Sequence, residues 1–449
     1  MKFFIRTFGC QMNVNESEIM AGVLEKEGFE WTENPQEADF IILNSCAVRE
    51  KAEHKLYGAI GYYEKLKKKN ENLVIAVGGC VAEKERKNIL KRFHGVDFVF
   101  GTRNYMDISE FYNKAKEGKR FSDFTDKFDN ITAELPKHPY SKHHGWINII
   151  YGCNKYCTYC IVPYTRSFEK SRPIEDIMNE VKYYNDNGYR EITFLGQNVD
   201  SYGKDFGDGK PKLNILIREA AKFESIKRIW FLTSYPTDIT DDLIEEISKN
   251  PKAAKNFHLP VQAGSDNILK KMNRRYTKEF YLDLLDKIKS NVENVTISGD
   301  IIVGFPGETD EDFMETVDLV KRARYERLNI AEYSPREGTI SAKYYEDNIP
   351  KRIKNKRFQY LMNIQKQINH EENEKYLDKT VLVIQENKTK SGAYLGRTIN
   401  NKVVIFESEE NLVGKFVKVK INKISAGPLY GEIISKETDL NFEKVEYYI

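Results

Sequence analysis

The stretch "NIIYGCNKYCTYC", residues 148–160, carries three cysteines within eight residues, directly after an apolar run. An apolar run before such a cluster predicts the end of a strand, with the cysteines on the loop that follows it. Three thiolates suit a metal centre that takes four ligands, and they leave its last position to another group. The three cysteines are Cys153, Cys157 and Cys160.

Zinc stays an alternative for this loop. A zinc finger or ribbon needs a second pair of ligands, and no cysteine follows Cys160. His143 and His144 stand about ten residues upstream of the loop, and either is a suitable further zinc ligand.

The composition is that of a globular protein of two to four domains, with 449 residues, 40% hydrophobic and 31% charged. No apolar run reaches the roughly 18 residues that a membrane span needs, and the N-terminus turns polar too early for a signal peptide. We therefore expect a cytoplasmic protein without a membrane partner. In that compartment thiols stay reduced, so the six cysteines are expected to be ligands rather than disulfides.

The chain divides into three regions of an expected α/β fold. Strand-like and amphipathic segments alternate over residues 1–116, which predicts a parallel sheet with crossover helices, and a polar linker follows over 117–139. Six strand–helix units over 140–370 predict a partial (βα)6 barrel, because eight units would be needed to close a full one. Five short strands over 371–438 predict a small antiparallel β-barrel of OB type, before a tail over 439–449.

Three further cysteines each stand just beyond a strand candidate of the first region, in "FGC", "NSC" and "GGC". Ligands of an open parallel sheet bind outside the carboxyl ends of its strands, so Cys10, Cys46 and Cys80 should meet at one edge. A single free cysteine would indicate no more than a small buried residue. Three at equivalent positions favour a metal site, either zinc with an open position or a [4Fe–4S] cluster.

The Cys-x3-Cys-x2-Cys motif, with an aromatic residue before its last cysteine and a place after the first strand of a βα barrel, resembles the radical S-adenosylmethionine superfamily. Two cysteine sets and a final β-barrel resemble, more narrowly, its methylthiotransferases, whose third domain is a TRAM module that binds RNA. The likeness extends over essentially the whole chain. It rests on the segments "FGCQMNVNESE", "NSCAVREKAEHK", "GGCVAE", "YGCNKYCTYCIVPYTR", "SRP", "LGQNVDSYG", "HLPVQAGSDNILKKMNRRYT" and "GDIIVGFPGETDEDF".

The residues after the first two cysteines resemble the branch that acts on tRNA. The resemblance implies a transferase of sulfur-containing groups that adds a methylthio group at C2 of N6-isopentenyladenosine, at position 37 beside the anticodon. Sister branches that modify N6-threonylcarbamoyladenosine in tRNA or a ribosomal-protein aspartate are alternatives. A non-enzymatic iron–sulfur or zinc RNA-binding protein is the alternative from another class.

The resemblance implies two [4Fe–4S] clusters and S-adenosylmethionine, which acts as methyl donor and as radical source. Cys153, Cys157 and Cys160 would hold the cluster that binds S-adenosylmethionine, and the three upstream cysteines an auxiliary cluster. The chemistry would come from the clusters and the 5′-deoxyadenosyl radical, with no catalytic side chain. Further cofactor contacts are expected from Tyr159, Gly196, Gln197, Asn198, Gln262, Asp300 and Gly304.

The expected partner is a tRNA anticodon stem-loop, with electrons from a flavodoxin, a ferredoxin or a reductase, and the protein is expected to be a monomer. The net charge is only +2, so RNA binding must rest on local patches. "KRIKNKR" (351–357) is one basic run, although a solvated helix face explains it as well. Candidate phosphate contacts are Arg166, Lys170, Arg172, Lys418 and Lys420.

Two positions depart from the family's usual pattern. Ser167 stands where glycine is expected after "PYTR", and "TSYP" (233–236) replaces a more usual Ser-His-Pro. Neither change touches a cysteine, so they bear on the fine cofactor contacts rather than on the class.

Overall fold

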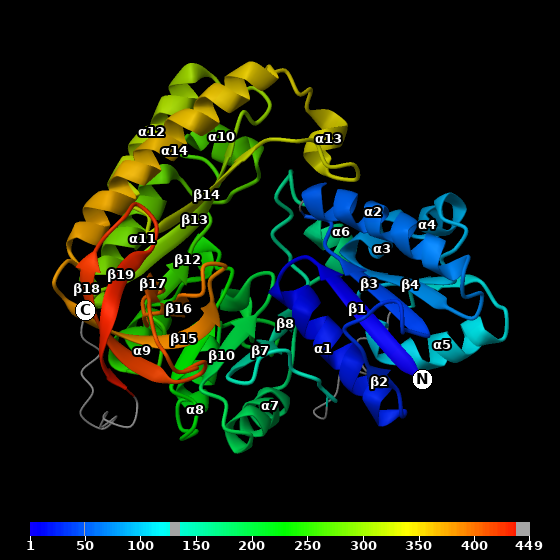
Figure 1. Cartoon of the computed structure of the whole chain (residues 1–449). Coiled ribbons are helices and arrows are strands. Elements are labelled where there is room, and N and C mark those ends of the chain that lie inside the picture. Colours follow the sequence, from blue (N-terminus) through cyan, green and yellow to red (C-terminus); the bar gives the residue numbers. More distant parts are fainter. Residues whose placement is uncertain (49, 126–134, 437–449) are drawn as a thin grey trace.

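The computed structural model describes residues 1–48, 50–125 and 135–436. Its first part is a six-stranded sheet in the order β2-β1-β3-β4-β5-β6, with every neighbouring pair parallel (Figure 1). The elements of this part are β1 (Lys2–Phe8), α1 (Gln11–Lys26), β2 (Glu30–Trp31), β3 (Phe40–Ser45), α2 (Glu50–Lys67), β4 (Val74–Gly79), α3 (Cys80–Glu85), α4 (Lys87–Arg92), β5 (Phe98–Phe100), α5 (Ile108–Lys116) and β6 (Phe121–Asp123).

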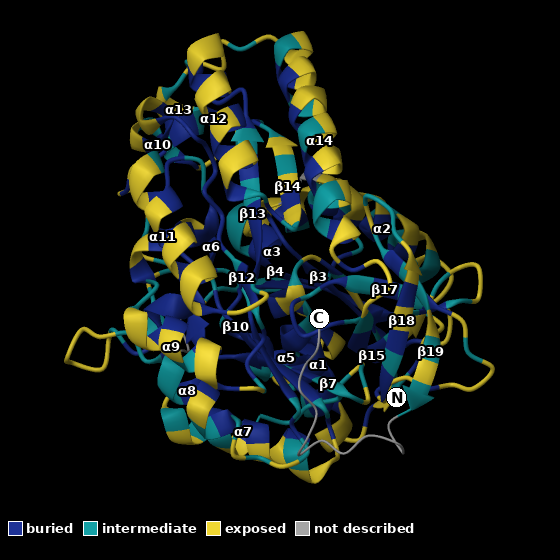
Figure 2. Cartoon of the chain, turned by 90° about the vertical axis from the view of Figure 1, so that its left-hand side faces the viewer, coloured by how far each residue is buried: buried dark blue, intermediate teal, exposed yellow. Residues whose placement is uncertain are grey.

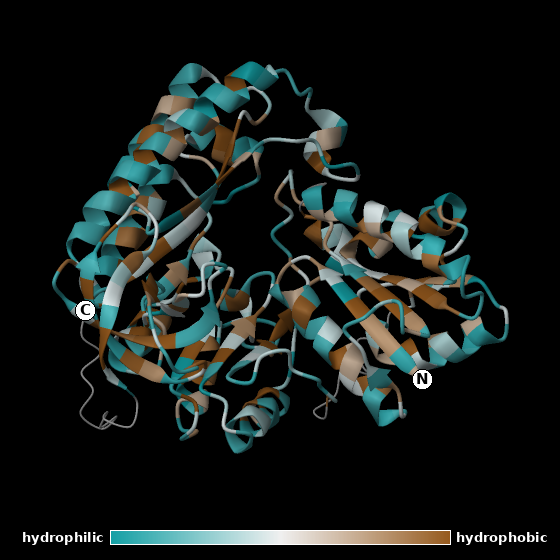
Figure 3. Ribbon diagram, viewed as in Figure 1, coloured by the Kyte–Doolittle hydropathy of each residue, from teal (hydrophilic) through white to brown (hydrophobic). Residues whose placement is uncertain are grey.

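Helices cover both faces of this sheet. One buried apolar cluster joins the sheet to α1 and α5, and a second joins it to α2, α3 and α4. The central strands β3 and β4 are buried along their whole length, as strands covered on both faces should be. The hydropathy colouring shows these strands as the apolar centre of the first part (Figure 3).

The predicted linker is not a free connection. Its residues 121–123 form β6, which pairs in parallel with β5. Further along, the Lys137 side chain is buried and bonds to the Glu180 carboxylate, to Asn15 Oδ1 (2.6 Å) and to the carbonyl oxygen of Trp146 (2.6 Å). Lys137 thus ties α1 to the second part, and the sequence pattern missed this because one buried charge leaves no periodic signal. Residues 126–134 of the predicted linker and the predicted tail lie outside the described residues.

The second part is the expected partial barrel. Two parallel three-stranded sheets, β7-β10-β11 and β12-β13-β14, are joined by a bridge between Ile229 and Ala253. The main elements are β7 (His144–Asn148), β8 (Ile150–Tyr151), α6 (Val162–Arg166), β9 (Lys170–Ser171), α7 (Ile174–Asp186), β10 (Glu191–Leu195), α8 (Leu213–Ala220), β11 (Arg228–Phe231), α9 (Asp241–Lys249), β12 (Asn256–His258), α10 (Asp266–Lys271), α11 (Lys278–Asn291), β13 (Thr296–Val303), α12 (Asp310–Ala323), β14 (Arg327–Glu332), α13 (Ile340–Tyr344) and α14 (Lys351–Glu374).

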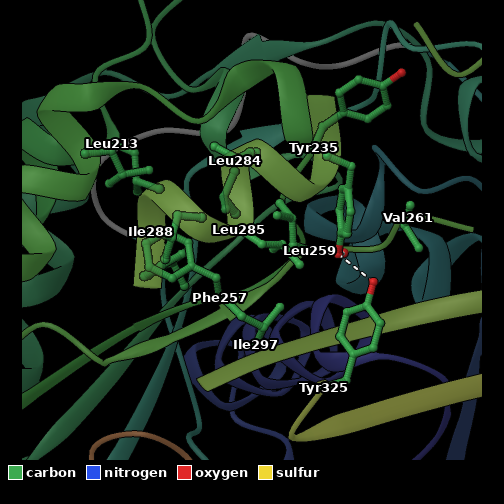
Figure 4. Packing of buried hydrophobic residues seen from close by; sticks show 14 of the residues in the cluster. Leu213, Tyr235, Phe257, Leu259, Val261, Leu284, Leu285, Ile288, Ile297 and Tyr325 are labelled. Atoms are coloured by element: carbon green, nitrogen blue, oxygen red, sulfur yellow. Dashed lines mark hydrogen bonds between the residues drawn. The ribbon is translucent and has the colours of Figure 1, made fainter. Parts of the chain in front are cut away.

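The largest apolar cluster lies between these strands and their helices. Figure 4 shows Phe257 of β12, Leu259 just after it and Ile297 of β13 packed against side chains of α11. A tyrosine pair closes this core, since the Tyr325 hydroxyl donates to that of Tyr281 (2.8 Å), which donates to the Leu259 carbonyl oxygen (2.8 Å). Figure 2 shows the exposed residues on the outer sides of the helices, as expected for amphipathic helices around a barrel.

The third part is a closed five-stranded barrel in the order β15-β16-β17-β19-β18. Its strand pairs are antiparallel as predicted, except that β17 and β19 run parallel. Arg228 of β11 is fully buried and fastens this barrel to the second part, donating to the carbonyl oxygens of Arg397 (2.6 Å) and Leu382 (3.2 Å). The strands are β15 (Thr380–Lys388), β16 (Tyr394–Arg397), β17 (Val403–Phe406), β18 (Phe416–Lys423) and β19 (Leu429–Lys436). None of the helices described here has both the length and the apolar composition of a membrane span.

Candidate metal centres

Cys10, Cys46 and Cys80, named here the first thiol site, meet at one edge of the first sheet. The parallel register pairs Phe8 with Ser45 and Ser45 with Gly79, so the residues that follow β1, β3 and β4 lie side by side. Cys10 caps α1, and Cys80 is the first residue of α3. The predicted convergence is therefore a direct consequence of strand register.

Hydrogen bonds and one buried arginine hold these thiols. Hydrogen bonding with Cys46 lowers the pKa of Cys10 and of Cys80 to about 6, and the same hydrogen bonds raise the pKa of Cys46. Arg166, only 4% exposed, donates through Nε to Cys80 Sγ (3.2 Å) and through Nη1 to Glu16 Oε1 (2.5 Å). Its positive charge further favours the thiolate forms of Cys10 and Cys80. The site is thus prepared to hold negatively charged sulfur.

Cys153, Cys157 and Cys160, named the second thiol site, lie on the loop between β8 and α6. The Cys160 amide donates to the Cys157 carbonyl oxygen (2.9 Å), which folds the loop into a turn. Arg274 is buried and donates to Cys157 Sγ (3.6 Å) and to the Tyr276 hydroxyl (2.6 Å). Burial raises the pKa of Cys153 and of Cys160 to about 12, so their thiolates need a cationic centre to be stable.

The two thiol sites are neighbours. Ile161, the residue after Cys160, is buried in the same apolar cluster as Cys80 of the first part. Arg166, five residues further on, reaches Cys80 itself. The Thr102 hydroxyl donates to the Thr165 carbonyl oxygen (2.9 Å) and closes the contact. One short segment of the second part therefore belongs to both sites.

The donor set of the second thiol site fits an iron–sulfur cluster better than a zinc ion completed by His144. His144 begins β7 while Cys153 follows its end, so the strand separates them by about 13 Å. His144 Nε2 is instead paired with Thr193 Oγ1 (2.6 Å). No three Cys, His, Asp or Glu side chains in the described ranges surround a position for a single metal ion. In a [4Fe–4S] cluster each thiolate binds its own iron, so three separate thiols suit it.

Unpaired polar atoms stand beside the second thiol site, at the ends of β7 and β10. Both amide atoms of Asn148 are buried without a hydrogen-bond partner, and so is Asn198 Oδ1. The Asn198 amide nitrogen donates to Asp238 Oδ2 (2.6 Å), which orients the side chain. Buried polar atoms normally have partners, so these indicate a polar ligand at the strand ends. They fit the amino acid part of S-adenosylmethionine, for which Asn198 was predicted.

Two of the predicted glycines, Gly196 and Gly304, lie in close contact with side chains of the protein. A Cβ at Gly304, whose φ is +71°, would lie 2.4 Å from Cγ of Lys354. At Gly196 it would lie 2.4 Å from Cγ2 of Ile150. Both glycines stay predicted cofactor contacts, because a crowded Cβ position does not exclude a ligand on another side of the backbone.

The other predicted cofactor residues remain predictions. Gln197 Nε2 donates to Met12 Sδ (2.6 Å), two residues after Cys10, so it lies close to the first thiol site. Tyr159 is half-buried in the cysteine loop. Gln262, four residues after β12, has a strained φ of +79°, and its backbone amide donates to the Asp300 carbonyl oxygen (2.9 Å).

A cavity of about 1160 Å³ lies between the partial barrel and the C-terminal barrel. Gln11, next to Cys10, lines one side of it, and residues of the C-terminal barrel such as Lys415 line another. Trp146 and Trp230 of the barrel interior also line it. A small apolar cluster formed by Met12, Tyr151 and Leu195 joins Trp146 to Cys10. The cavity therefore leads from the C-terminal barrel towards the first thiol site.

Arg166 and Arg172 are not available to RNA phosphates, which corrects their prediction. They are 4% and 3% exposed, and their partners are Glu16 and Glu180. Two basic residues at the start of α14 are likewise buried and paired, Lys354 with the exposed Asp347 and Arg357 with the buried Glu308. Charge in a sequence does not tell whether a partner far along the chain neutralises it.

Three other predicted phosphate contacts are compatible with the structure and stay predictions. Lys418 and Lys420 lie on one face of β18, because they alternate with the buried Val417 and Val419. Lys170 is half-buried on β9.

Ser167 has a backbone conformation that favours glycine, with φ +62° and ψ −158°. This region of backbone space costs a residue with a side chain about 1–3 kcal/mol. Ser167→Gly would relieve this strain, but glycine also makes the unfolded chain more flexible, which favours unfolding. As the net effect, we expect the free energy of unfolding to rise by roughly 1 kcal/mol. Thermal or denaturant unfolding measures this. Ser171→Gly, on β9, is the control and should destabilise the protein; equal effects would contradict the strain.

Sequence reasoning missed Arg274, Glu16 and Asp238 as site residues. Each lies within or close to a segment that carries the family resemblance, but nothing in the segments tells which side chain turns towards sulfur. Asp238 is 3% exposed and accepts from Lys155 (2.5 Å), which anchors the cysteine loop to the segment that follows β11. Its pKa is about 2, because the charge of Lys155 outweighs the effect of burial.

Comparison with known families agrees with this arrangement. The chain matches the uncharacterized protein family UPF0004 over residues 2–101, the Radical SAM superfamily over 147–320 and the TRAM domain over 374–434. These ranges fall within the three predicted regions, whose exact boundaries stay predictions.

Similar proteins cover almost the whole chain. A tRNA-2-methylthio-N(6)-dimethylallyladenosine synthase of Petrotoga mobilis is 67% identical over 97% of this chain and 99% of its own length. Proteins of the same name from Thermotoga petrophila and Alkaliphilus oremlandii are 57% and 45% identical, each over 97% of this chain and over 97% and 93% of their own lengths.

Among solved structures, the radical S-adenosylmethionine methyltransferase TsrM of Kitasatospora setae matches with a TM-score of 0.53 and 12% identity, over 74% of this chain and 72% of its own. At this identity the likeness shows the fold alone. It supports the expected α/β barrel class.

Proposed function

The chain belongs to the tRNA-2-methylthio-N(6)-dimethylallyladenosine synthase family, and on that basis we propose that it adds a methylthio group to C2 of N6-isopentenyladenosine at position 37 of tRNA. One observation of the structure supports the proposal most strongly. The segment Cys160–Arg166 contributes a thiol to the second thiol site and a hydrogen-bond donor to the first. The reaction must activate a carbon atom and deliver sulfur to that atom. Two adjacent three-thiol sites meet these two requirements.

The two sites would hold different groups. Cys153, Cys157 and Cys160 would bind a [4Fe–4S] cluster together with S-adenosylmethionine, whose polar end would meet Asn148 and Asn198. The first thiol site would bind an auxiliary [4Fe–4S] cluster. The same composition of three thiols plus one buried arginine at each site supports two clusters of one kind.

C2 of adenine carries an unactivated C–H bond, which no acid or base of the protein can readily cleave. When bound, the second-site cluster and S-adenosylmethionine supply an adenosyl radical that can remove this hydrogen, while the auxiliary cluster offers a place for the added sulfur. The protein's own residues position these groups and exclude water. Arg166 and Arg274 fix one thiol of each site, and the buried wall of Met12, Tyr151 and Leu195 shields the space beside Cys10.

The target base must reach the thiol sites from a folded RNA. Enzymes that act on a base take it out of the stack, and single-stranded loops make this possible at low cost. We propose that the anticodon loop enters the large cavity beside the C-terminal barrel. Trp146 and Trp230 offer aromatic surfaces to bases there, and the exposed Lys142, Arg327 and Lys415 offer charge to phosphates.

Nucleoside mass spectrometry tests the proposed function. The protein is reconstituted with iron and sulfide and incubated with isopentenylated tRNA, S-adenosylmethionine and a reductant. The expected product is 2-methylthio-N6-isopentenyladenosine. Product only from threonylcarbamoylated tRNA, or only on a ribosomal protein, would assign the chain to a sister branch. Absence of 5′-deoxyadenosine from fully loaded protein would contradict the radical reaction.

The cavity predicts where RNA phosphates bind. We expect Lys142→Ala and Lys415→Ala each to weaken tRNA binding and to reduce the slope of log K against log salt by about 1, as the loss of one phosphate contact should. Lys270→Ala, an equally exposed lysine on α10 away from the cavity, is the control. Filter binding at several salt concentrations measures the slope. An unchanged slope in both cavity variants would place the RNA elsewhere.

Other partner properties stay predictions. A flavodoxin, a ferredoxin or a reductase would supply the electrons, the enzyme would act as a monomer, and its tRNA substrate would place it in the cytoplasm.

A further inference from the structure

Arg166 follows the second thiol site along the chain, and its side chain contacts the first thiol site. It ends α6, six residues after Cys160, yet its side chain lies in the first part of the molecule. Nε donates to Cys80 Sγ (3.2 Å), while Nη1 and Nη2 reach the two oxygens of Glu16 (2.5 and 3.3 Å). Glu16 lies on α1, the helix that Cys10 caps. One guanidinium thus contacts the third thiol and the helix of the first.

This geometry has an electrostatic consequence for whatever the first thiol site holds. Hydrogen bonds to cluster sulfur and nearby positive charge stabilise the reduced, more negative form, and so raise its reduction potential. The effect is large in a buried site, because water does not screen it. Arg166 and Glu16 are 4% and 2% exposed, so their charges act on Cys80 through the protein interior.

We propose that Arg166 is a positioning residue that sets the reduction potential of the cluster at the first thiol site, with Glu16 moderating its charge. The inference rests on the proposed function, which places a cluster there. Arg166 belongs to the segment that follows Cys160 of the second thiol site. The position of the second site and the reduction potential at the first are therefore linked through six residues of chain.

The molecule contains a matched control. Arg172 is 3% exposed and pairs with Glu180 (2.7 Å), as Arg166 pairs with Glu16. No contact between Arg172 and a cysteine is seen in the described part of the chain; its other bond goes to the Asn148 carbonyl oxygen (2.7 Å). A purely structural role of buried arginine–glutamate pairs would make substitutions at the two pairs equivalent.

The test is a potentiometric titration followed by electron paramagnetic resonance. It uses the full-length protein with Cys153, Cys157 and Cys160 all replaced by alanine, so that only the first-site cluster contributes to the signal. Arg166→Lys keeps the charge but loses the donor to Cys80, so we expect the midpoint potential to fall. Glu16→Gln removes the compensating charge and should raise it. Each shift should be about tenfold in the one-electron reduction equilibrium, or about 59 mV. Arg172→Lys and Glu180→Gln should leave the potential unchanged.

The outcomes separate this inference from the proposed function. Shifts of opposite sign at Arg166 and Glu16, with none at the control pair, would support it. Equal potentials in all variants would overturn it, even though the protein holds its cluster. Loss of first-site iron in both test variants, with iron kept in the controls, would also overturn it, since Arg166 would then only hold the fold. A parent protein without first-site iron would instead contradict the proposed function.

Discussion

Replacing Cys157 with alanine is expected to abolish both methylthio-adenosine formation and cleavage of S-adenosylmethionine, while the first thiol site keeps its iron. Cys157 is 8% exposed and bonds to the buried Arg274, so its loss removes one iron ligand and leaves the guanidinium without its sulfur acceptor. Nothing else on the loop replaces a thiolate. The iron content should fall from about eight to about four per chain, as expected when one of two [4Fe–4S] clusters is lost.

Three measurements on one sample check this result: iron and sulfide content, 5′-deoxyadenosine by chromatography, and the modified nucleoside by mass spectrometry. Thr158→Ala is the control. It removes a hydroxyl that donates to the Lys271 carbonyl oxygen (2.9 Å) beside Cys157, but it leaves all three thiols in place. Loss of all iron in Cys157→Ala would contradict two independent sites.

Replacing Cys80 with alanine is expected to give the complementary result. S-adenosylmethionine should still be cleaved at the second thiol site, but no sulfur should reach the base. Cys80 is the thiol that receives the Arg166 hydrogen bond, and it is 2% exposed, so water is a poor substitute ligand there. The nucleoside product should fall below detection, while 5′-deoxyadenosine is still formed.

Cys10→Ala and Cys46→Ala should behave in the same way, because the three thiols form one site. Ser45→Ala is the control, since Ser45 adjoins Cys46 at the end of β3 without a thiol. If variants at both sites lose the same iron and the same activities, the two-cluster interpretation is wrong. If Cys80→Ala still gives product, sulfur does not pass through the first thiol site.

Much of this architecture was predictable because it depends on local patterns. The predicted strands of all three regions are strands in the structure, because runs of apolar and β-branched residues between turns are a direct signal of a strand. Convergence of Cys10, Cys46 and Cys80 also followed from the sequence. Each thiol occurs one or two residues after a parallel strand. Because Phe8, Ser45 and Gly79 lie side by side at the strand ends, the cysteines that follow them are neighbours in space.

Other features were decided only by tertiary structure. The sequence indicated that Arg166 and Arg172 were available to bind phosphates. Arg166 is instead paired with Glu16, which lies 150 residues away along the chain. The short strand β6 has no periodic signal of its own and forms because β5 offers an open edge. The positive φ of Gly304, +71°, and its packing against Lys354 are likewise features of the folded chain.

The sequence alone therefore determined which segments form strands, the two sets of thiols and the family chemistry, because each depends on a short motif or an apolar run that a local window contains. Tertiary structure decided which charges are buried and how the segment after Cys160 reaches the first thiol site. Burial of a charge depends on a partner that no local window contains, and its cost is met only where chain segments far apart come together.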